Sequence, residues 1–302
     1  MVNKHRLNDL FIFQQMPLKL KIIMTEKRIR DFTERFQGMT YISNSGGVDS
    51  TVLSHMVKKI FPNTPNVFIN TGLEYPENVD HVRKTENLIE VKPKISFYQV
   101  IQKYGYPVIS KSLSQQIYEC RHTRSKKLRR KRLHGDPDQY KTGKIPECWK
   151  FLIKAPFKIS ERCCFFLKKE PANRYEKKTG HHPFIGTMAS ESRHRSQSWV
   201  VHGCNAFDLK RPQSRPLSFW TKEDIWAYIK MHDLPYSQIY DKGIDRTGCI
   251  FCLFGIHKEK RERFEILKQT HPELYQYCME KLGIREVLKF IRDRGELTLF
   301  DF

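Results

Sequence analysis

Short β-prone runs alternate with segments of helical periodicity along the first two thirds of the chain. In the segments 25–37 and 51–60 apolar residues recur on one side of a helix, as Val52, Met56 and Ile60 do. Four runs predict strands, the third of them weak: 41–43, 66–70, 89–92 and 183–188. At 302 residues the chain could be one α/β domain with elaborations or two small domains.

Polar residues and glycines mark the ends of several predicted helices. Thr25 is the expected N-cap of the helix over 25–37, and Gly38 its expected end. The segment 221–224 matches a capping box that opens a helix through Trp226. The tail is helical in pattern over 258–282, and its predicted core residues are Phe264, Leu267, Leu274 and Tyr277.

The hexapeptide Ser45-Gly46-Gly47-Val48-Asp49-Ser50 lies between the first predicted strand and the helix after it. Two adjacent glycines let the backbone approach a ligand with its N–H groups exposed. The amino end of the helix adds about half a positive charge at the same point, so this arrangement favours a phosphate. Asp49 and Ser50 can cap the helix or help to hold Mg²⁺ and phosphate oxygens. The alternative is a Gly-Gly turn that Asp49 caps without any ligand.

Two further turns follow predicted strands. Thr71-Gly72-Leu73-Glu74 comes after the second strand, and Glu191-Ser192-Arg193-His194-Arg195 comes shortly after the fourth. Ligands of open parallel sheets bind beyond the carboxyl ends of strands, so we expect these turns to face the hexapeptide. Arginine suits such a place because its planar fork binds oxyanions bidentately. A plain strand-to-helix connection and a surface ion-pair cluster are the alternatives.

Basic residues dominate the composition. The 302 residues include 54 lysines and arginines against 33 aspartates and glutamates, a formal net charge of +21. Such a field attracts nucleic acids and phosphates, although a basic surface also serves solubility alone. The charge is densest over 121–132, where we expect polyanion contacts rather than only a solvated helix face or loop. The residues concerned are Arg121, Arg124, Lys126, Lys127, Arg129, Arg130, Lys131 and Arg132. Turn clusters predict an exposed excursion over 133–147.

No apolar run approaches the ~18 residues that span a bilayer. The run at 10–13 is too short for the core of a signal peptide. We therefore expect a cytoplasmic protein, whose eight cysteines are ligands, nucleophiles or buried thiols rather than disulfides.

Four of the cysteines form a suggestive set. Cys163 and Cys164 are adjacent, and Cys249 and Cys252 form a Cys-x-x-Cys pair. Together they supply the thiolates that one [4Fe–4S] cluster needs. Tetrahedral Zn²⁺ accepts the same donors, but a vicinal pair strains a mononuclear site. Thiols without a metal are the third possibility.

Two more motifs occur towards the end of this region, Arg215-Pro216-Leu217 before Trp220 and Leu234-Pro235-Tyr236. Together with the motifs above, they resemble the phosphoadenosine phosphosulfate (PAPS) reductase family over roughly 39–255. The hexapeptide resembles the PP-loop of ATP pyrophosphatases. The chain is most similar to the iron–sulfur branch, which includes adenylyl-sulfate reductases and the ATP pyrophosphatases of DNA phosphorothioation.

The resemblance implies an adenine nucleotide alpha-hydrolase-like (Rossmann-like) fold, a five-stranded parallel sheet with helices on both faces. We expect a helical extension over 1–38, the PP-loop domain over 39–255 with a basic insertion at about 119–150, and a helical C-terminal region over 256–302. By motif match, nucleotide-binding residues are Ser45, Gly46, Gly47, Val48, Asp49 and Ser50, joined by Thr71, Gly72, Glu74, Glu191, Arg193 and Arg195. Asp49, Ser50 and Arg193 are the expected catalytic residues, and Cys163, Cys164, Cys249 and Cys252 the cluster ligands.

Two departures from the family pattern shape the functional hypotheses. Reductases of the family carry a degraded loop, whereas this one is complete, and the nucleophilic cysteine expected near the carboxyl end is missing, since Cys278 lies in a predicted helix. The first hypothesis is an ATP pyrophosphatase that adenylylates DNA or RNA for sulfur transfer, with Mg²⁺ and a partner such as a cysteine desulfurase. The second is a thioredoxin-dependent reductase of adenylyl sulfate or PAPS that releases sulfite. The third is a non-catalytic nucleic-acid-binding regulator.

Overall fold

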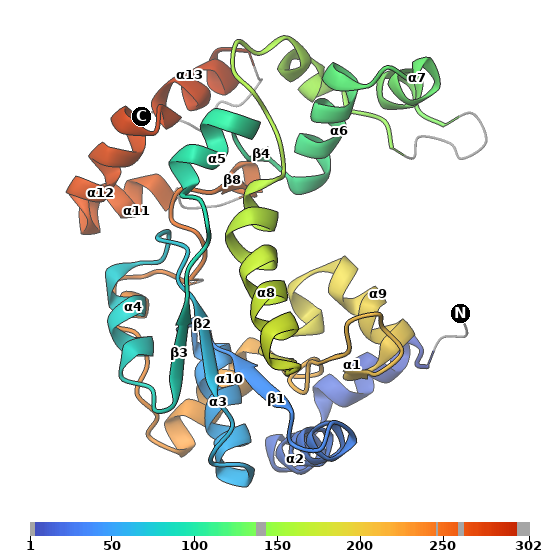
Figure 1. The fold of residues 1–302 in the computed structure, drawn as a ribbon, viewed down its shortest axis with the longest axis vertical. Helices are drawn as coiled ribbons and strands as arrows, with labels where there is room; N and C mark the ends of the chain where they lie inside the picture. Colours follow the sequence, from blue (N-terminus) through green and yellow to red (C-terminus); the bar gives the residue numbers. More distant parts are fainter. Residues whose placement is uncertain (1–3, 137–142, 246, 259–262, 295–302) are drawn as a thin grey trace. The chain divides into compact units, whose positions relative to one another are not determined.

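The computed structural model describes residues 4–136, 143–245, 247–258 and 263–294 (Figure 1). Its contacts divide the chain into two interleaved compact units. The first consists of 1–70, 74–92 and 171–247, and the second of 71–73, 93–170 and 248–302. Each unit is described by itself below. The domain boundaries expected from the sequence divide the chain along its length and stay a prediction.

A six-stranded sheet in the order β3-β2-β1-β5-β7-β6 forms the centre of the first unit. All neighbours pair in parallel except β6, which runs antiparallel to β7 at the edge. The strands are β1 (Thr40–Ser43), β2 (Asn66–Ile69), β3 (Leu88–Val91), β5 (His182–Ile185), β6 (Asn205–Ala206) and β7 (Gln213–Ser214). The predicted five-stranded parallel sheet is thus confirmed, with one antiparallel edge strand added.

Helices cover both faces of this sheet. Successive side chains of a strand point to opposite faces, and Tyr41 and Ile42 of β1 accordingly belong to different apolar clusters. Ile42 joins the large cluster that includes buried residues of α1 (Leu7–Gln15), α2 (Leu18–Arg35), α3 (Val48–Ile60), α9 (Arg193–His202) and α10 (Lys222–Met231). Tyr41 packs with Tyr175 of α8 (Glu170–Thr179). The first unit is completed by α4 (Pro76–Arg83) and the short 3₁₀ turns η3 (Ala189–Glu191) and η4 (Gln238–Tyr240).

The predicted helix caps fared unequally. Thr25 is not an N-cap, because the apolar stripe of α2 extends back to Leu18 and Thr25 lies inside the helix. It is fully buried, and its hydroxyl accepts a hydrogen bond of 2.9 Å from Trp220 Nε1. Gly38 follows the end of α2 as expected, with a φ of +81°. The capping box at Thr221 and Asp224 is also confirmed.

The second unit is mostly helical. It has a two-stranded parallel sheet of β4 (Val108–Ile109) and β8 (Leu253–Phe254). Its helices are α5 (Phe97–Tyr104), α6 (Lys111–His122), α7 (Lys126–His134), α11 (Arg263–Thr270), α12 (Pro272–Gln276) and α13 (Ile284–Arg294). It also has the 3₁₀-helices η1 (Glu147–Lys154) and η5 (Ile256–Lys258) and the π-helices η2 (Phe165–Lys169) and η6 (Tyr277–Lys281).

The part of the tail that the structure describes is helical, as predicted, but only some of its predicted core residues are buried. Phe264 and Leu267 are fully buried, whereas Tyr277 is 45% exposed. The turn η6 has π-helical hydrogen bonding, which shifts the register so that Cys278, not Tyr277, enters the core. Residues 259–262 and 295–302 lie outside the described part.

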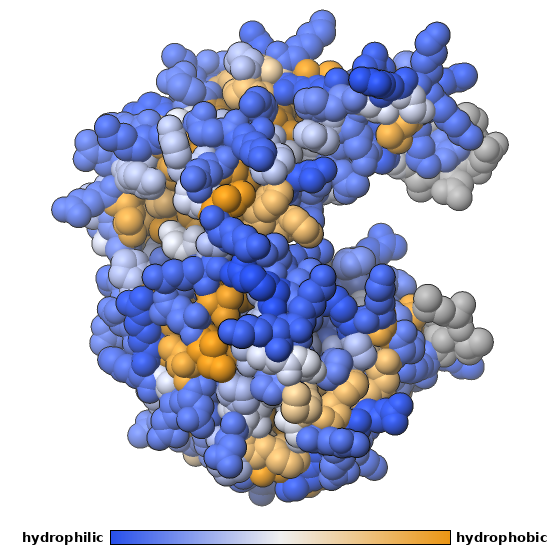
Figure 2. All heavy atoms as spheres, in the orientation of Figure 1, coloured by the Kyte–Doolittle hydropathy of each residue, from blue (hydrophilic) through white to orange (hydrophobic). Residues whose placement is uncertain are grey.

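The basic segment over 121–132 is the end of α6 and most of α7. Ser125 caps α7 by accepting a hydrogen bond from the N–H of Leu128. No residue of α7 is buried, and the surface over it is mainly hydrophilic (Figure 2). Of the excursion predicted over 133–147, residues 137–142 lie outside the described residues. None of the described helices is long and apolar enough to cross a membrane.

Candidate nucleotide site and cysteine centre

The hexapeptide forms a tight turn from β1 into α3, and both glycines are required by its geometry. Gly46 has a φ of +77°, and a Cβ there would lie 2.8 Å from the carbonyl oxygen of Asn78. A Cβ on Gly47 would lie 2.7 Å from the hydroxyl oxygen of Thr247. Any larger side chain would therefore displace one of these neighbours.

Side chains of the loop hold it from within. The hydroxyl of Ser50 accepts a hydrogen bond from the N–H of Ser45 at 3.2 Å and donates to the carbonyl of Gly47 at 2.8 Å. Asn44 accepts the N–H of Gly46 at 3.0 Å. Ser50, predicted to hold a ligand, is 3% exposed and is first of all a structural element of the turn.

At the start of α3, no acceptor among the described residues binds the N–H groups of Gly47 and Ser50, and both residues are buried. The N–H of Val48 donates to the hydroxyl of Tyr240 at 3.1 Å. Because these groups are at a helix N-terminus, they attract negative charge and can hydrogen-bond a phosphate.

The turn after β5 packs directly against this loop. Ile185, the last residue of β5, pairs with Ser43, so the two turns leave the same edge of the sheet. A Cβ on Gly186 would lie 2.9 Å from the carbonyl oxygen of Asp49. Glycine at this position therefore lets the two backbones touch.

The residues of the predicted Glu-Ser-Arg-x-Arg motif have different structural roles. Ser192 caps α9 by accepting a hydrogen bond from the N–H of Arg195. The guanidinium of Arg195 pairs with the carboxylate of Glu191, which also accepts the N–H of Met188. Arg193 is exposed and, in the part of the chain that the structure describes, pairs with no carboxylate. Arg193 is therefore the arginine of this motif that remains open to an oxyanion.

The Thr-Gly-Leu-Glu turn is shared between the two units. Thr71 and Gly72 belong to the second unit and Glu74 to the first. Thr71 is buried and its hydroxyl accepts the N–H of Leu73 at 3.2 Å. The expectation that Thr71, Gly72 and Glu74 contact the nucleotide stays a prediction.

Sequence reasoning missed two residues at the loop, Tyr240, which contacts it through its side chain, and Asn78, which approaches it through its backbone. Tyr240 binds the N–H of Val48 and also exchanges a hydrogen bond with Thr247 at 3.2 Å. Burial raises the pKa of Tyr240, which keeps its hydroxyl neutral. Asn78, 2% exposed, has a side-chain oxygen with no hydrogen-bond partner in the described part of the chain. Both lie far from the loop in sequence, and nothing in the local pattern marks them.

The four predicted ligand cysteines all lie in the second unit. Cys163 and Cys164 open the helical segment before η2, with their sulfur atoms 4.0 Å apart. Cys249 and Cys252 lie in the turn that leads into β8, where the N–H of Cys252 donates to the carbonyl of Cys249. Arg263 fixes this turn by donating to the carbonyl of Cys252 at 2.7 Å.

The four thiols influence one another electrostatically. The Cys163 thiol donates to Cys164, and this bond raises the pKa of Cys163, as do burial and the other three cysteines. The same bond lowers the pKa of Cys164, with help from Lys111, Lys168 and Lys169. Burial raises the pKa of Cys252 to about 11.

This chemistry fits a metal cluster in donor type and charge. Four thiols gather beside cationic side chains that offset the negative charge of a thiolate-bound centre. As the described side chains stand, however, no three His, Cys, Asp or Glu residues are close enough to hold one metal ion. The cysteines are thus brought together without being closed into a coordination shell.

A family model described as the phosphoadenosine phosphosulfate reductase domain matches residues 39–253. The chain belongs to this family. An uncharacterized protein of Methanocaldococcus jannaschii, MJ0973, is 23% identical over 84% of this chain and 51% of its own length. A phosphoadenosine 5'-phosphosulfate reductase of Xylella fastidiosa is 26% identical over 82% of this chain and 87% of that protein. The chain spans about half the length of the first curated relatives it matches.

Two solved structures of low similarity complete the comparison. A PAPS reductase from Candida auris has 20% identity and a TM-score of 0.44, covering 74% of this chain and 87% of that one. The U34-tRNA thiolase NcsA from Methanococcus maripaludis, solved with its [4Fe-4S] cluster, has 14% identity and a TM-score of 0.37, covering 94% and 86%. At such scores neither likeness supports a conclusion about function.

Within this member of the family, the predicted basic residues fall into two groups. Arg121 is half-buried and donates hydrogen bonds to four backbone carbonyls, those of Leu152, Ile153, Ala155 and Phe157. Arg132 pairs with Glu119, and Lys131 with Asp136. These three side chains are engaged within the protein. The other five are exposed on or just before α7: Arg124, Lys126, Lys127, Arg129 and Arg130.

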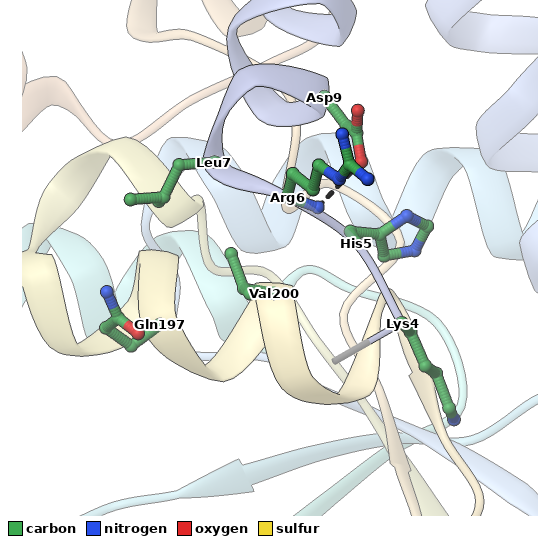
Figure 3. Close-up of a pocket in the computed structure, with 7 residues that line it drawn as sticks. All are labelled: Lys4, His5, Arg6, Leu7, Asp9, Gln197 and Val200. Atoms are coloured by element: carbon green, nitrogen blue, oxygen red, sulfur yellow. Dashed lines mark hydrogen bonds between the residues drawn. The ribbon is translucent and has the colours of Figure 1, made fainter. Parts of the chain in front are cut away.

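A separate pocket of about 590 Å³ lies in the first unit, between the start of α1 and α9 (Figure 3). Three basic side chains, Lys4, His5 and Arg6, line it, together with Leu7, Asp9, Gln197 and Val200. The carboxylate of Asp9 already accepts the N–H of Arg6 at 2.7 Å. None of the residues predicted to bind nucleotide lines this pocket.

Proposed function

We propose that the chain binds ATP at the loop of residues 45–50 and cleaves it to AMP and pyrophosphate. The AMP would activate an oxygen of a nucleic acid for replacement by sulfur. The observation that carries this proposal is the pair of unbound N–H groups of Gly47 and Ser50 at the start of α3. Backbone donors at a helix N-terminus suit the phosphates of a nucleotide.

The reaction consists of two displacements. An oxygen of the acceptor attacks the α-phosphorus of ATP; a new O–P bond forms as the bond to the bridging oxygen breaks, and pyrophosphate leaves with that electron pair. A donor at the oxidation level of sulfide then attacks the activated atom of the acceptor, and AMP leaves with the original oxygen. The acceptor exchanges oxygen for sulfur without a net redox change.

The residues of the loop would act mainly on the leaving group. The amides of Gly47 and Ser50 and the helix dipole stabilise the charge that develops on pyrophosphate. Arg193, exposed at the first turn of α9, supplies a guanidinium for a phosphate oxygen. Asp49 is the candidate for holding Mg²⁺ against the phosphates.

The acceptor is inferred from charge. Five exposed basic residues on and beside α7 add to a net charge of +21. Cations so arranged bind phosphodiesters by releasing counterions, largely without regard to sequence. We therefore assign Arg124, Lys126, Lys127, Arg129 and Arg130 to nucleic-acid contact and leave out Arg121, Lys131 and Arg132.

Cys163, Cys164, Cys249 and Cys252 would hold a [4Fe–4S] cluster, with Zn²⁺ as the alternative. A cluster would supply a site where sulfur is bound or passed on. Iron and sulfide analysis of anaerobically purified protein tests the assignment, because zinc and iron are distinguished directly.

The activity is tested with α-labelled ATP, Mg²⁺ and a mixed nucleic acid, by following labelled AMP. We expect AMP formation by the wild-type protein, and a loss of at least 100-fold in Asp49→Ala, as for removal of a charge-stabilising group. Asp80→Ala is the control, since Asp80 is an exposed aspartate on the neighbouring α4. Absence of AMP with every nucleic acid tried would contradict the proposal.

A second candidate follows from the relative in Xylella fastidiosa, which is named a PAPS reductase and is covered over most of its length. The same site would then bind a sulfonucleotide, and sulfite would be released with thioredoxin. The thiols of Cys278 and Cys204 are poorly suited to act as the nucleophile, because both are buried and burial raises the pKa of each. Sulfite formation from PAPS or adenylyl sulfate would favour this candidate.

A further inference from the structure

A line of planar side chains lies beside the cysteine pair in the second unit. Tyr104, the last residue of α5, is stacked on Phe166 with centroids 4.6 Å apart and an interplanar angle of 18°. On α6, Tyr118 is stacked on His122 at 4.3 Å and 25°. The guanidinium of Arg162 lies over both tyrosine rings, 5.7 Å from each centroid.

Arg162 and His122 are the exposed members of this line. Tyr104 and Tyr118 are half-buried, and the guanidinium lies within cation–π distance of both rings. Among the described residues no carboxylate pairs with Arg162, so its charge is not neutralised within the protein. A flat cation is thus presented to solvent in a fixed orientation, directly before Cys163 in the sequence.

Further cations and an exposed ring surround the same place. Lys103 lies 5.5 Å from the centroid of Tyr104. Lys111, Lys168 and Lys169 are exposed, and all three act electrostatically on Cys164. Phe165 is 46% exposed, which is unusual for a phenylalanine. The patch therefore combines flat surfaces for stacking with positive charges for a phosphate backbone.

We propose that Arg162, positioned by Tyr104 and Tyr118, is a stacking site for unpaired bases of a folded RNA. The proposal rests on the proposed function and narrows its acceptor. Unpaired bases stack on arginine planes and aromatic rings, and their backbone is held by neighbouring cations. In duplex DNA each base is stacked between neighbouring bases, so its faces cannot stack on Arg162 or on an aromatic ring. RNA loops expose base faces as a stable feature.

The test measures binding of the full-length protein, without ATP, to three labelled probes by fluorescence anisotropy. The probes are an RNA hairpin with an eight-nucleotide loop, the same RNA annealed into a continuous duplex, and single-stranded DNA of the loop-containing sequence. We expect the hairpin to bind most tightly. Equal affinity for the DNA would overturn the assignment to RNA.

Arg162→Lys separates stacking from charge, because lysine keeps the positive charge but not the plane. We expect about 10-fold weaker hairpin binding and unchanged duplex binding. Tyr118→Leu should weaken hairpin binding by a smaller factor, since Tyr118 positions Arg162. The control is Arg285→Ala, an exposed arginine on α13 of the same unit, which should leave both affinities unchanged.

Two further outcomes would overturn the proposal: wild-type hairpin affinity in Arg162→Lys, or equal weakening toward hairpin and duplex in both variants. Thermal unfolding checks that the variants are folded, and Arg162→Lys replaces an exposed side chain. Because the binding measurements contain no ATP, their outcome does not depend on whether the protein forms AMP. A protein that binds the hairpin through Arg162 but makes no AMP would refute the proposed function alone.

Discussion

Replacing Arg121 by alanine should destabilise the second unit without directly removing a nucleic-acid contact. The guanidinium donates at 2.9 Å to Ile153, 2.7 Å to Phe157, 2.6 Å to Leu152 and 3.0 Å to Ala155, in each case to the backbone carbonyl. Arg121→Ala removes every one of these donors at once. The segment 152–157 then loses the side chain that organises its carbonyls.

The size of the effect follows from the number of bonds and their exposure. A hydrogen bond from a charged donor contributes about 1.5 to 3 kcal/mol. Four bonds from one half-buried group are not additive, because water can reach some of the released carbonyls. We therefore expect a loss of about 3 kcal/mol, roughly the value of one to two such bonds. Arg121→Lys should lose less stability than Arg121→Ala, because one ammonium still reaches some of the carbonyls, although fewer than the guanidinium does.

Urea unfolding followed by circular dichroism measures the loss. With an m-value of about 3 kcal/mol/M, the midpoint should fall by roughly 1 M. Hydrogen exchange by mass spectrometry should show faster exchange in peptides covering 147–157. Arg130→Ala is the matched control, because Arg130 is exposed on α7 and should change stability by less than about 0.5 kcal/mol. A wild-type midpoint for Arg121→Ala, together with weakened nucleic-acid binding, would refute the reasoning.

Three further predictions concern the two sites and the core. Gly186→Ala should weaken ATP binding at least 10-fold by calorimetry, because its Cβ would press on the loop backbone at 2.9 Å, and normal binding would show that the turn can move aside. Asp224→Ala should cost about 3 to 5 kcal/mol in chemical denaturation, since the ammonium of Lys21, 2% exposed, loses its 2.6 Å ion pair and keeps only its bond to the carbonyl of Gln14; a smaller cost would mean that this bond is enough for the buried ammonium. In metal-free protein, Cys164 has a lowered pKa because it accepts the Cys163 thiol, so the thiolate should persist below the ordinary value of about 8.5. Iodoacetamide labelling followed by mass spectrometry should then stay fast as the pH falls through 8, and a rate that falls as for an ordinary thiol would contradict it.

The sheet and the loop could be predicted because their signals are local. Four strands of the sheet are short β-prone runs, and the Gly-Gly pair is visible in the sequence between a predicted strand and a predicted helix. The edge strand β6 and its neighbour β7 have only two residues each, too few to produce a pattern. The start of α2 was missed because a threonine was taken as a cap although the apolar stripe continues before it.

Roles that depend on distant contacts could not be predicted. The hydroxyl of Tyr240 reaches the loop from 192 positions away, and the carbonyls that engage Arg121 lie 31 to 36 positions away. Composition marked Arg121 and Arg130 as equals, since both belong to one basic run. Burial separates them, and burial depends on the tertiary fold rather than on charge.

The two proposed kinds of anion site should differ in how they depend on salt. Neutral amides at the start of α3 would bind through short, directed hydrogen bonds, so their contribution to nucleotide affinity should change less with ionic strength than that of the exposed Arg193. The cations around α7 would act through counterion release, and their contribution to nucleic-acid binding should fall steeply as salt rises. The contribution of Arg162 should depend on salt to an intermediate degree, because stacking survives at salt concentrations that screen its charge. Discrimination between a looped and a duplex RNA should therefore persist as salt rises and total affinity falls, since salt does not remove the stacking contribution that only the loop makes.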